Sequence, residues 1–160
     1  MSTAWIEPGG KLHILPPRFK SHADFAMQWL QQHDLTLFTF LSGDTVDARP
    51  HASIWERALV KAGWIKYSNF REAIVPRNPT GASLHTMADL MAESLADQAL
   101  DPERMSITFW TLTSQAMKPI RHDEDHFPWE PGDTVNTASF LQRYASRDAM
   151  DDLYSALGLD

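Results

Sequence analysis

Strand-like and helix-like segments follow one another along this chain in no regular order, and this irregularity most constrains the fold. Short β-rich runs predict strands near residues 4–7, 11–15, 64–67, 73–75 and 106–113, and a buried strand or extended segment at 35–41. Apolar residues at helical spacing predict helices near 22–33, 51–62, 82–97, 137–145 and 148–157. Because the segments do not alternate regularly, the pattern predicts an α+β fold rather than a doubly wound parallel sheet. Short β-hairpins would pack against about three main helices, followed by a helical C-terminal extension.

Turn and cap signals support these boundaries. The Pro-Gly-Gly sequence at residues 8–10 predicts a hairpin turn between the first two strands. Ser21 is expected to cap the first helix, with Asp24 three residues later in an approximate capping box. Gly63 is expected to end the second helix in the left-handed conformation.

The composition places the chain among ordinary globular proteins, since 43% of its 160 residues are apolar and 22% are charged. We expect a single compact domain over residues 1–160. The chain has no cysteine, which excludes thiolate catalysis, cysteine-zinc sites and disulfides. No apolar run approaches the ~18 residues of a membrane span, and the N-terminal pattern is not that of a signal peptide. These features predict a cytoplasmic protein that does not contact membranes.

Charge is distributed unevenly between the two halves of the chain. The formal net charge is -7, yet residues 1–80 hold nine basic and seven acidic residues, whereas residues 81–160 hold five basic and fourteen acidic ones. An acidic half beside a near-neutral half indicates two surfaces of different character. Alternatively, the excess of acidic residues is a solvated surface that only keeps the protein soluble.

Three segments of the near-neutral half resemble motifs of small uncharacterised proteins of bacteriophages and prophages. Residues 5–10 read W-I-E-P-G-G, residues 22–26 read H-A-D-F-A, and residues 58–66 read A-L-V-K-A-G-W-I-K. The family carries W-I-x-P-x-G, H-A-D-W-A-like and A-L-x-x-G-W-I-R motifs, so the resemblance covers about residues 4–76. It implies a phage setting, and a bacterial host cytoplasm as the location, but no activity and no catalytic residues. Lys66 stands where the family has Arg, which replaces a bidentate guanidinium by a point charge.

Two polar groups of residues are candidates for chemistry. His22 and Asp24 could form a polar site at a helix N-terminus, although capping and packing also account for both residues. His122 and His126, four residues apart, share a helix face and could bind a divalent metal together with the carboxylates between them. The H-E-x-x-H motif of metalloproteases is not met, because Asp123 occupies the glutamate position. We therefore expect no cofactor, with a divalent metal as the alternative.

The N-terminal half also contains basic residues with aromatic residues between them, a combination that suits single-stranded nucleic acid. The basic residues are Arg57, Lys61, Lys66, Arg71 and Arg77, and the aromatic ones are Trp64, Tyr67 and Phe70. Phosphate affinity depends on the number of neutralised charges, and this group supplies few in an acidic chain. The sequence argues against direct nucleic-acid binding.

The acidic half predicts a binding surface for a basic protein. The residues expected to form it are Glu93, Asp97, Asp123, Glu124 and Asp125, with Phe127 and Trp129 as apolar anchors. With the phage resemblance and the lack of a catalytic motif, this predicts a phage accessory protein that inhibits or redirects a host or defence protein, such as one that binds nucleic acid. The alternatives are a metal-dependent enzyme using His122 and His126, and a virion or packaging component.

Overall fold

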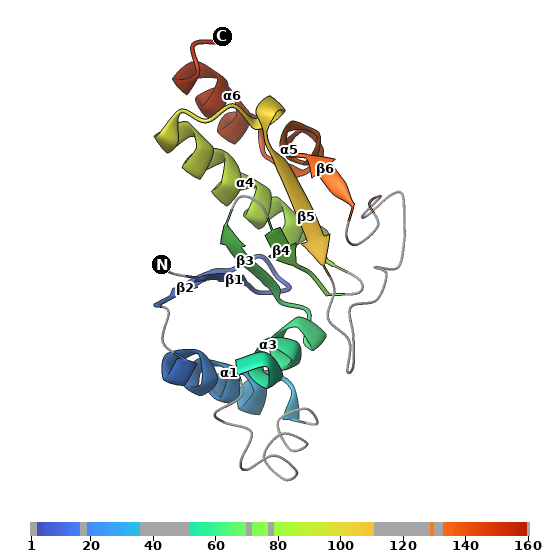
Figure 1. Cartoon of the computed structure of the whole chain (residues 1–160). Helices are drawn as coiled ribbons and strands as arrows, with labels where there is room; N and C mark the ends of the chain where they lie inside the picture. Colours follow the sequence, from blue (N-terminus) through green and yellow to red (C-terminus); the bar gives the residue numbers. More distant parts are fainter. Residues whose placement is uncertain are drawn as a thin grey trace.

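The computed structural model describes residues 3–16, 19–35, 52–69, 72–76, 79–110, 129 and 133–159. Within these residues, six strands form one mixed sheet in the order β2-β1-β3-β4-β5-β6. Five α-helices and one short 3-10 helix lie around this sheet (Figure 1). The α+β class predicted from the sequence is confirmed, and the predicted hairpins are joined edge to edge in a single sheet.

The strands are β1 (Thr3–Ile6), β2 (Leu12–Leu15), β3 (Ile65–Asn69), β4 (Glu72–Ile74), β5 (Ser106–Trp110) and β6 (Thr134–Asn136). The helices are α1 (Phe19–His33), α3 (Ala52–Lys61), α4 (Gly81–Gln98), the 3-10 helix η2 (Pro102–Arg104), α5 (Thr137–Tyr144) and α6 (Arg147–Ala156). The predicted helices all form, and their ends agree with the prediction to within three residues.

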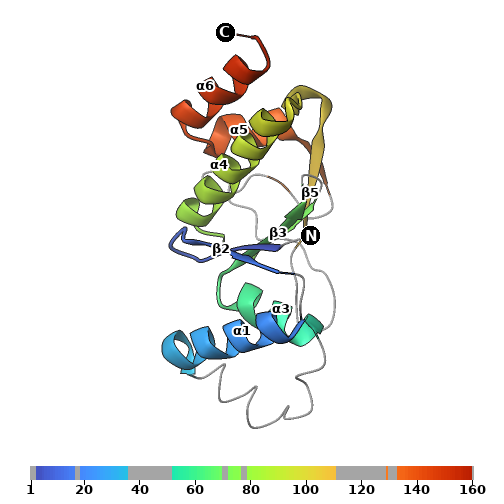
Figure 2. The ribbon, with the colours of Figure 1, turned by 90° about the vertical axis from the view of Figure 1, so that its left-hand side faces the viewer.

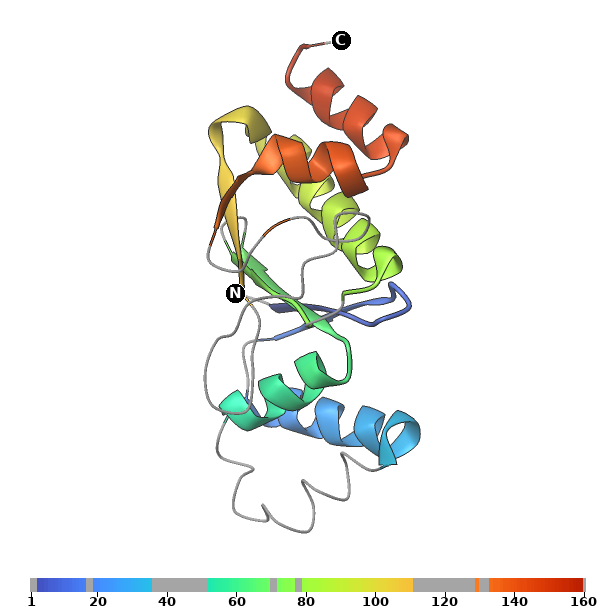
Figure 3. The same ribbon diagram turned by 90° about the vertical axis from the view of Figure 1, so that its right-hand side faces the viewer.

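Helices cover both faces of the sheet, and each face has its own apolar core. Figures 2 and 3 show α1 and α3 on one side of β1 to β3, and α4, α5 and α6 on the other side. Side chains alternate between faces along a strand, so Ile6 and Ala4 of β1 join the larger core under α4. Trp5, between them, joins the smaller core under α1 and α3 together with Trp64.

These two tryptophans come from the motif segments at residues 5–10 and 58–66. Trp5 is 1% exposed and Trp64 is fully buried. Gly63 ends α3 with a φ of 104°, and Trp64 N–H then donates to the Leu59 carbonyl at 3.0 Å, as in a Schellman motif. The prediction for Gly63 is confirmed. The motif residues therefore build the smaller core, which explains their spacing by packing.

Three features of the fold differ from the sequence prediction. Strand β4 pairs with β5 in parallel, and α4 is the connection between them. Strand β6, which pairs with β5, was not predicted because its three residues are too few for a periodic signal. Helix α1 begins at Phe19, so Ser21 lies inside its first turn rather than at the cap. The predicted segment 35–41 lies outside the described residues from position 36 onward.

The start of α4 holds the β1–β2 turn in place. The Thr80 side chain caps α4 by accepting a hydrogen bond from Ser83 N–H at 3.1 Å. Ser83 Oγ in turn donates to the Glu7 carbonyl at 2.6 Å, and Thr80 Oγ1 donates to the Pro8 carbonyl. Because Ser83 is fully buried, these bonds satisfy polar groups that water cannot reach. Two segments about 75 residues apart are thereby fixed to each other.

Tyr67 of β3 makes the free energy of unfolding depend on pH in the alkaline range. Its side chain is 6% exposed, and burial raises the pKa of the phenol well above its ordinary value. The buried neutral phenol therefore contributes fully to the free energy of unfolding below the pKa of the unfolded chain, about 10, and this contribution is lost as the pH rises above that value. We expect the free energy of unfolding, measured with urea between pH 9 and pH 11, to fall by at most about 1.4 kcal/mol per pH unit above pH 10 from this group.

The variant Tyr67→Phe removes this titration and should flatten the decline, whereas the control Tyr154→Phe on α6 should not. An equally steep decline in Tyr67→Phe and the wild type would show that other groups cause the alkaline loss.

Candidate interaction surface

Helix α4 presents two carboxylates of the acidic half on its exposed face. Its buried face includes Leu84, Met87, Ala88, Met91 and Leu95, which pack against the sheet. Glu93 and Asp97 are exposed and lie one helical turn apart, and neither forms an ion pair with a described residue. The helix thus directs both carboxylates into solvent without neutralising them.

Helix α6 packs against α4 in a fixed register (Figures 1 and 3). The Asp89 carboxylate on α4 accepts a hydrogen bond of 2.6 Å from Ser146 N–H, the residue that caps α6. One turn earlier on α4, His85 Nδ1 donates to the Tyr144 carbonyl at 2.7 Å. These two bonds hold the junction between α5 and α6 to α4. Any surface formed by α4 and α6 is therefore built on rigid elements.

The acidic layer, as we name α4, η2, β6, α5 and α6 with their flanking residues, carries many more carboxylates than cations. Its described carboxylates are Asp89, Glu93, Asp97, Asp101, Glu103, Asp133, Asp148, Asp151 and Asp152, and its described arginines are Arg104, Arg143 and Arg147. Among the described residues of the layer, only Asp89, beside His85, and Asp101, beside Arg104, lie within ion-pair distance of a basic side chain. The remaining carboxylates create a negative potential over the layer.

The residues predicted for this surface are only partly described. Glu93 and Asp97 lie in the acidic layer, whereas Asp123, Glu124, Asp125 and Phe127 fall outside the described residues. Trp129 is described, and its ring stacks on Phe109 with a centroid separation of 6.0 Å. It also meets the rings of Phe140 and Tyr144 edge-on, at 5.9 and 6.2 Å. Trp129 therefore packs against the larger core of its own chain.

Helix α6 contributes further acidic residues to the layer, which the sequence analysis did not select for the site. Asp148, Asp151 and Asp152 are exposed, and Leu153 is the buried residue that seats the helix. The amphipathic spacing of α6 was a usable signal, because one apolar stripe and a polar remainder are typical of a surface helix. The packing of α6 on α4 could not be predicted from the sequence.

The candidate polar site at the start of α1 has a structural explanation for one of its residues. His22 Nε2 donates to the Pro16 carbonyl at 2.6 Å, which ties the helix to the end of β2. Asp24 is exposed. Residues two apart do not share a helix face, so the two side chains point away from each other.

The candidate metal ligands His122 and His126 lie outside the described residues. Within the described ranges, no three His, Asp or Glu side chains are grouped as a metal site would require. In those same ranges, no helix is long and apolar enough to span a bilayer.

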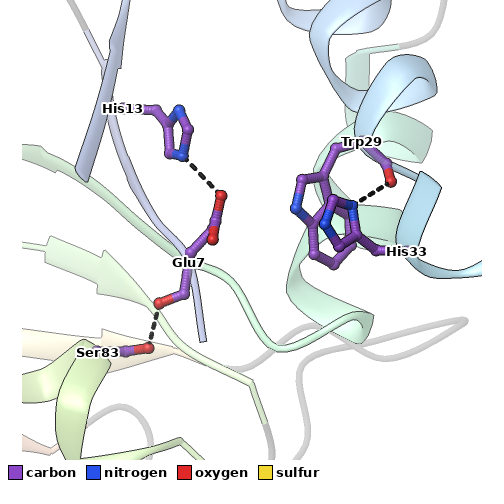
Figure 4. A network of polar contacts seen from close by, with 5 residues as sticks. All are labelled: Glu7, His13, Trp29, His33 and Ser83. Atoms are coloured by element: carbon purple, nitrogen blue, oxygen red, sulfur yellow. Dashed lines mark hydrogen bonds and ion pairs between the residues drawn. The ribbon is translucent and has the colours of Figure 1, made fainter. Parts of the chain in front are cut away.

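The sequence did not predict the network of polar contacts that joins Glu7 to His13 and to Ser83 (Figure 4). His13 Nε2 lies 2.8 Å from Glu7 Oε1, and its ring is 5.0 Å from Phe25 and 5.1 Å from Trp64. Ser83 bonds the backbone oxygen of Glu7 rather than the imidazole. A nucleophile must contact its base, so Glu7, His13 and Ser83 form a structural network and not a catalytic triad.

A polar hollow of about 420 Å³ lies beside β4 and β5, lined by Glu72, Arg104, Met105, Ser106 and Thr108. Its lining contains two hydroxyls, one charge of each sign and no histidine. Glu72 stands opposite Thr108 in the pairing of β4 with β5. The acidic layer, which carries many charges of one sign on packed helices, is the better-supported candidate surface.

Comparisons with protein-family models, curated proteins and solved structures found no match to this chain.

Proposed function

We propose that this protein acts by binding another protein, and that the acidic layer forms the contact. The carrying observation is that α4 and α6, fixed to each other, present exposed carboxylates without cationic partners among the described residues. A partner with a basic surface gains electrostatic complementarity there, which raises the association rate and sets specificity. Proteins that bind nucleic acid have such surfaces.

The motif resemblance supports a phage or prophage accessory protein as the setting for this activity. In that setting, the acidic layer would cover a basic surface of a host or defence protein and keep its natural ligand away. The motif residues Trp5, Gly63 and Trp64 serve the smaller core and the end of α3. The acidic layer lies outside the resembling segment, so a function specific to this chain belongs to that layer.

The test is capture of a partner from a lysate of the bacterial host, with the partner then purified and its affinity measured by titration. The variant with Glu93→Gln, Asp97→Asn, Asp151→Asn and Asp152→Asn should bind at least about tenfold more weakly, a loss of about 1.4 kcal/mol. Binding by the wild type should weaken as salt rises from about 50 to about 300 mM, because salt screens exposed charges. Asp148 is left unchanged because it lies in the first turn of α6, where a carboxylate favours the helix dipole.

Two double variants that lose the same charge test whether binding depends on the acidic layer or only on the net charge of the protein. The double variant Glu93→Gln/Asp97→Asn should weaken binding, whereas Asp24→Asn/Glu72→Gln removes the same charge from exposed positions elsewhere and should not. Equal losses in the two doubles, or no stoichiometric partner in the lysate, would contradict the proposal.

Under those outcomes, melting in the presence of Zn²⁺, Mn²⁺ or Mg²⁺ tests the metal-enzyme alternative, because a specific ligand raises stability. Proteomics of purified particles tests the virion alternative.

A further inference from the structure

Strand β2 lies at an edge of the sheet and carries an exposed apolar side chain. In the order of the described strands, β2 stands at one end and β6 at the other. Ile14 of β2 is 59% exposed, which is high for a large apolar side chain in a strand. Edge strands of this kind offer unpaired backbone groups to another strand.

The register shows which backbone groups point outward. Glu7 N–H donates to the Lys11 carbonyl at 2.8 Å, while the Glu7 carbonyl accepts from Gly10 N–H, so residues 7 and 11 form the closing bonded pair of the hairpin. Bonded and non-bonded pairs alternate along an antiparallel ladder. His13, opposite Trp5, therefore bonds to β1. Leu12 and Ile14 direct their N–H and C=O groups away from β1, toward the open side.

Within β2 itself, the charged and proline residues that normally protect an edge are absent, whereas Lys11 and Pro16 lie just outside it. Its four residues, Leu12 to Leu15, include no proline and no residue with a permanent charge, and its pairing with β1 is regular. The opposite edge differs, because β6 has only three residues and the Asn136 side chain is engaged with the Glu103 carbonyl at 3.0 Å. Among the described strands, β2 is thus the edge whose own residues carry no such protection.

We propose that β2 pairs with β2 of a second copy of this chain, antiparallel and about a two-fold axis at His13. This inference goes beyond the acidic layer and does not depend on it. The axis places Leu12 of each copy opposite Ile14 of the other. Because these are the residues whose backbone groups point outward, the symmetric pairing forms four N–H···O=C bonds across the interface. It also brings Ile14 against Leu12 of the other copy on one face of the sheet, which covers the exposed apolar surface.

The charges beside β2 favour this antiparallel arrangement. Lys11, exposed, immediately precedes the strand. The two-fold axis sets the two Lys11 residues at opposite ends of the ladder, about 13 Å apart along the strands, which exceeds the Debye length at physiological salt. A parallel arrangement would set them side by side. On the other face, each His13 ring is held toward its own chain by Phe25, Trp64 and the Glu7 carboxylate, which leaves space where the two copies meet.

The proposal is tested by sedimentation equilibrium from about 1 µM to about 1 mM protein, the range of weak association. The wild type should shift from monomer toward dimer across this range, because a small interface gives modest affinity. Ile14→Pro removes one outward N–H without disturbing the β1 ladder, as proline is tolerated when its nitrogen faces outward from an edge strand. Ile14→Lys keeps the backbone group but places a charge in the interface. Both variants should weaken dimerisation at least about tenfold.

The controls are Leu35→Lys and Leu159→Lys, which add the same charge at apolar positions of similar exposure, 65% and 62%. They should dimerise like the wild type. A wild type that stays monomeric to about 1 mM would overturn the proposal, and pairing with a strand of another protein would then be the remaining use of this edge. Dimers that survive Ile14→Lys as well as they survive the controls would also overturn it, since the contact would lie elsewhere. Circular dichroism of Ile14→Lys confirms that the compared chains are folded.

Discussion

Replacing Trp64 with alanine is expected to lower the free energy of unfolding by about 3–5 kcal/mol, the range for a large aromatic removed from a core. Trp64 is fully buried immediately before β3, and three rings surround it. Trp29 meets it edge-on at 5.1 Å, Phe25 meets it edge-on at 5.4 Å, and His13 lies 5.1 Å away. Alanine at this position would leave a cavity between α1 and the sheet. The melting temperature should fall by about 6–20 °C for a chain of this length.

The variant Trp64→Phe sharpens this prediction. In the part of the chain that the structure describes, the buried indole N–H of Trp64 has no acceptor. Its desolvation is a cost that the native state carries and that phenylalanine removes. Trp64→Phe should therefore lose less than half of what Trp64→Ala loses in urea unfolding. If the two variants are equally unstable, the indole ring itself is essential. A loss below about 1 kcal/mol in Trp64→Ala, the level of an ordinary surface substitution, would contradict the packing described above.

The second large effect is expected at Gly10, where alanine should cost about 2–4 kcal/mol through backbone strain and overpacking together. Gly10 has a φ of 96°, a region that favours glycine. A Cβ there would lie 2.9 Å from Thr86 Oγ1 and 3.1 Å from the Ala82 carbonyl oxygen, both on α4. The turn cannot move away to relieve the contact, because Ser83 holds it to the same helix.

Gly9, the preceding residue, is the matched control for Gly10. A Cβ at Gly9 meets nothing within 4 Å, and its φ is not positive. Gly9→Ala should therefore change stability by less than about 1 kcal/mol. Thermal melts of both variants at equal concentration decide the matter. Similar melting temperatures for Gly9→Ala and Gly10→Ala would show that the turn is not pressed against α4.

Much of the fold could be predicted from the sequence because its local signals agree with the final structure. The Pro-Gly-Gly turn, Gly63 at the end of α3 and the apolar stripe of α4 each follow from residues within one or two turns. The parallel pairing of β4 with β5 could not be predicted, since its partners are separated by the whole of α4. The early start of α1 was missed because Ser21 carries a cap signal, whereas Arg18, the residue before Phe19 in the sequence, does not.

The candidate surface divides in the same way. Helical spacing was enough to place Glu93 and Asp97 on one exposed face of α4. That Asp89 would be used to hold the start of α6, and that α6 would therefore extend the same layer, depends on a contact over 57 residues. Likewise, no pattern in the sequence links His13 to Glu7, because the pairing is produced by the hairpin that lies between them.

The position of α4 after β4 has a consequence for synthesis. β1 to β4 form an antiparallel set that can pair as soon as residue 74 has left the ribosome, since N-terminal segments fold first during translation. Until α4 has also emerged, Ile6, Ile65 and Tyr67 present one apolar face without its cover. The nascent chain is thus most prone to aggregate while the 18 residues of α4 are emerging, so a pause in translation at that stage would be more harmful than a pause after α4 has emerged.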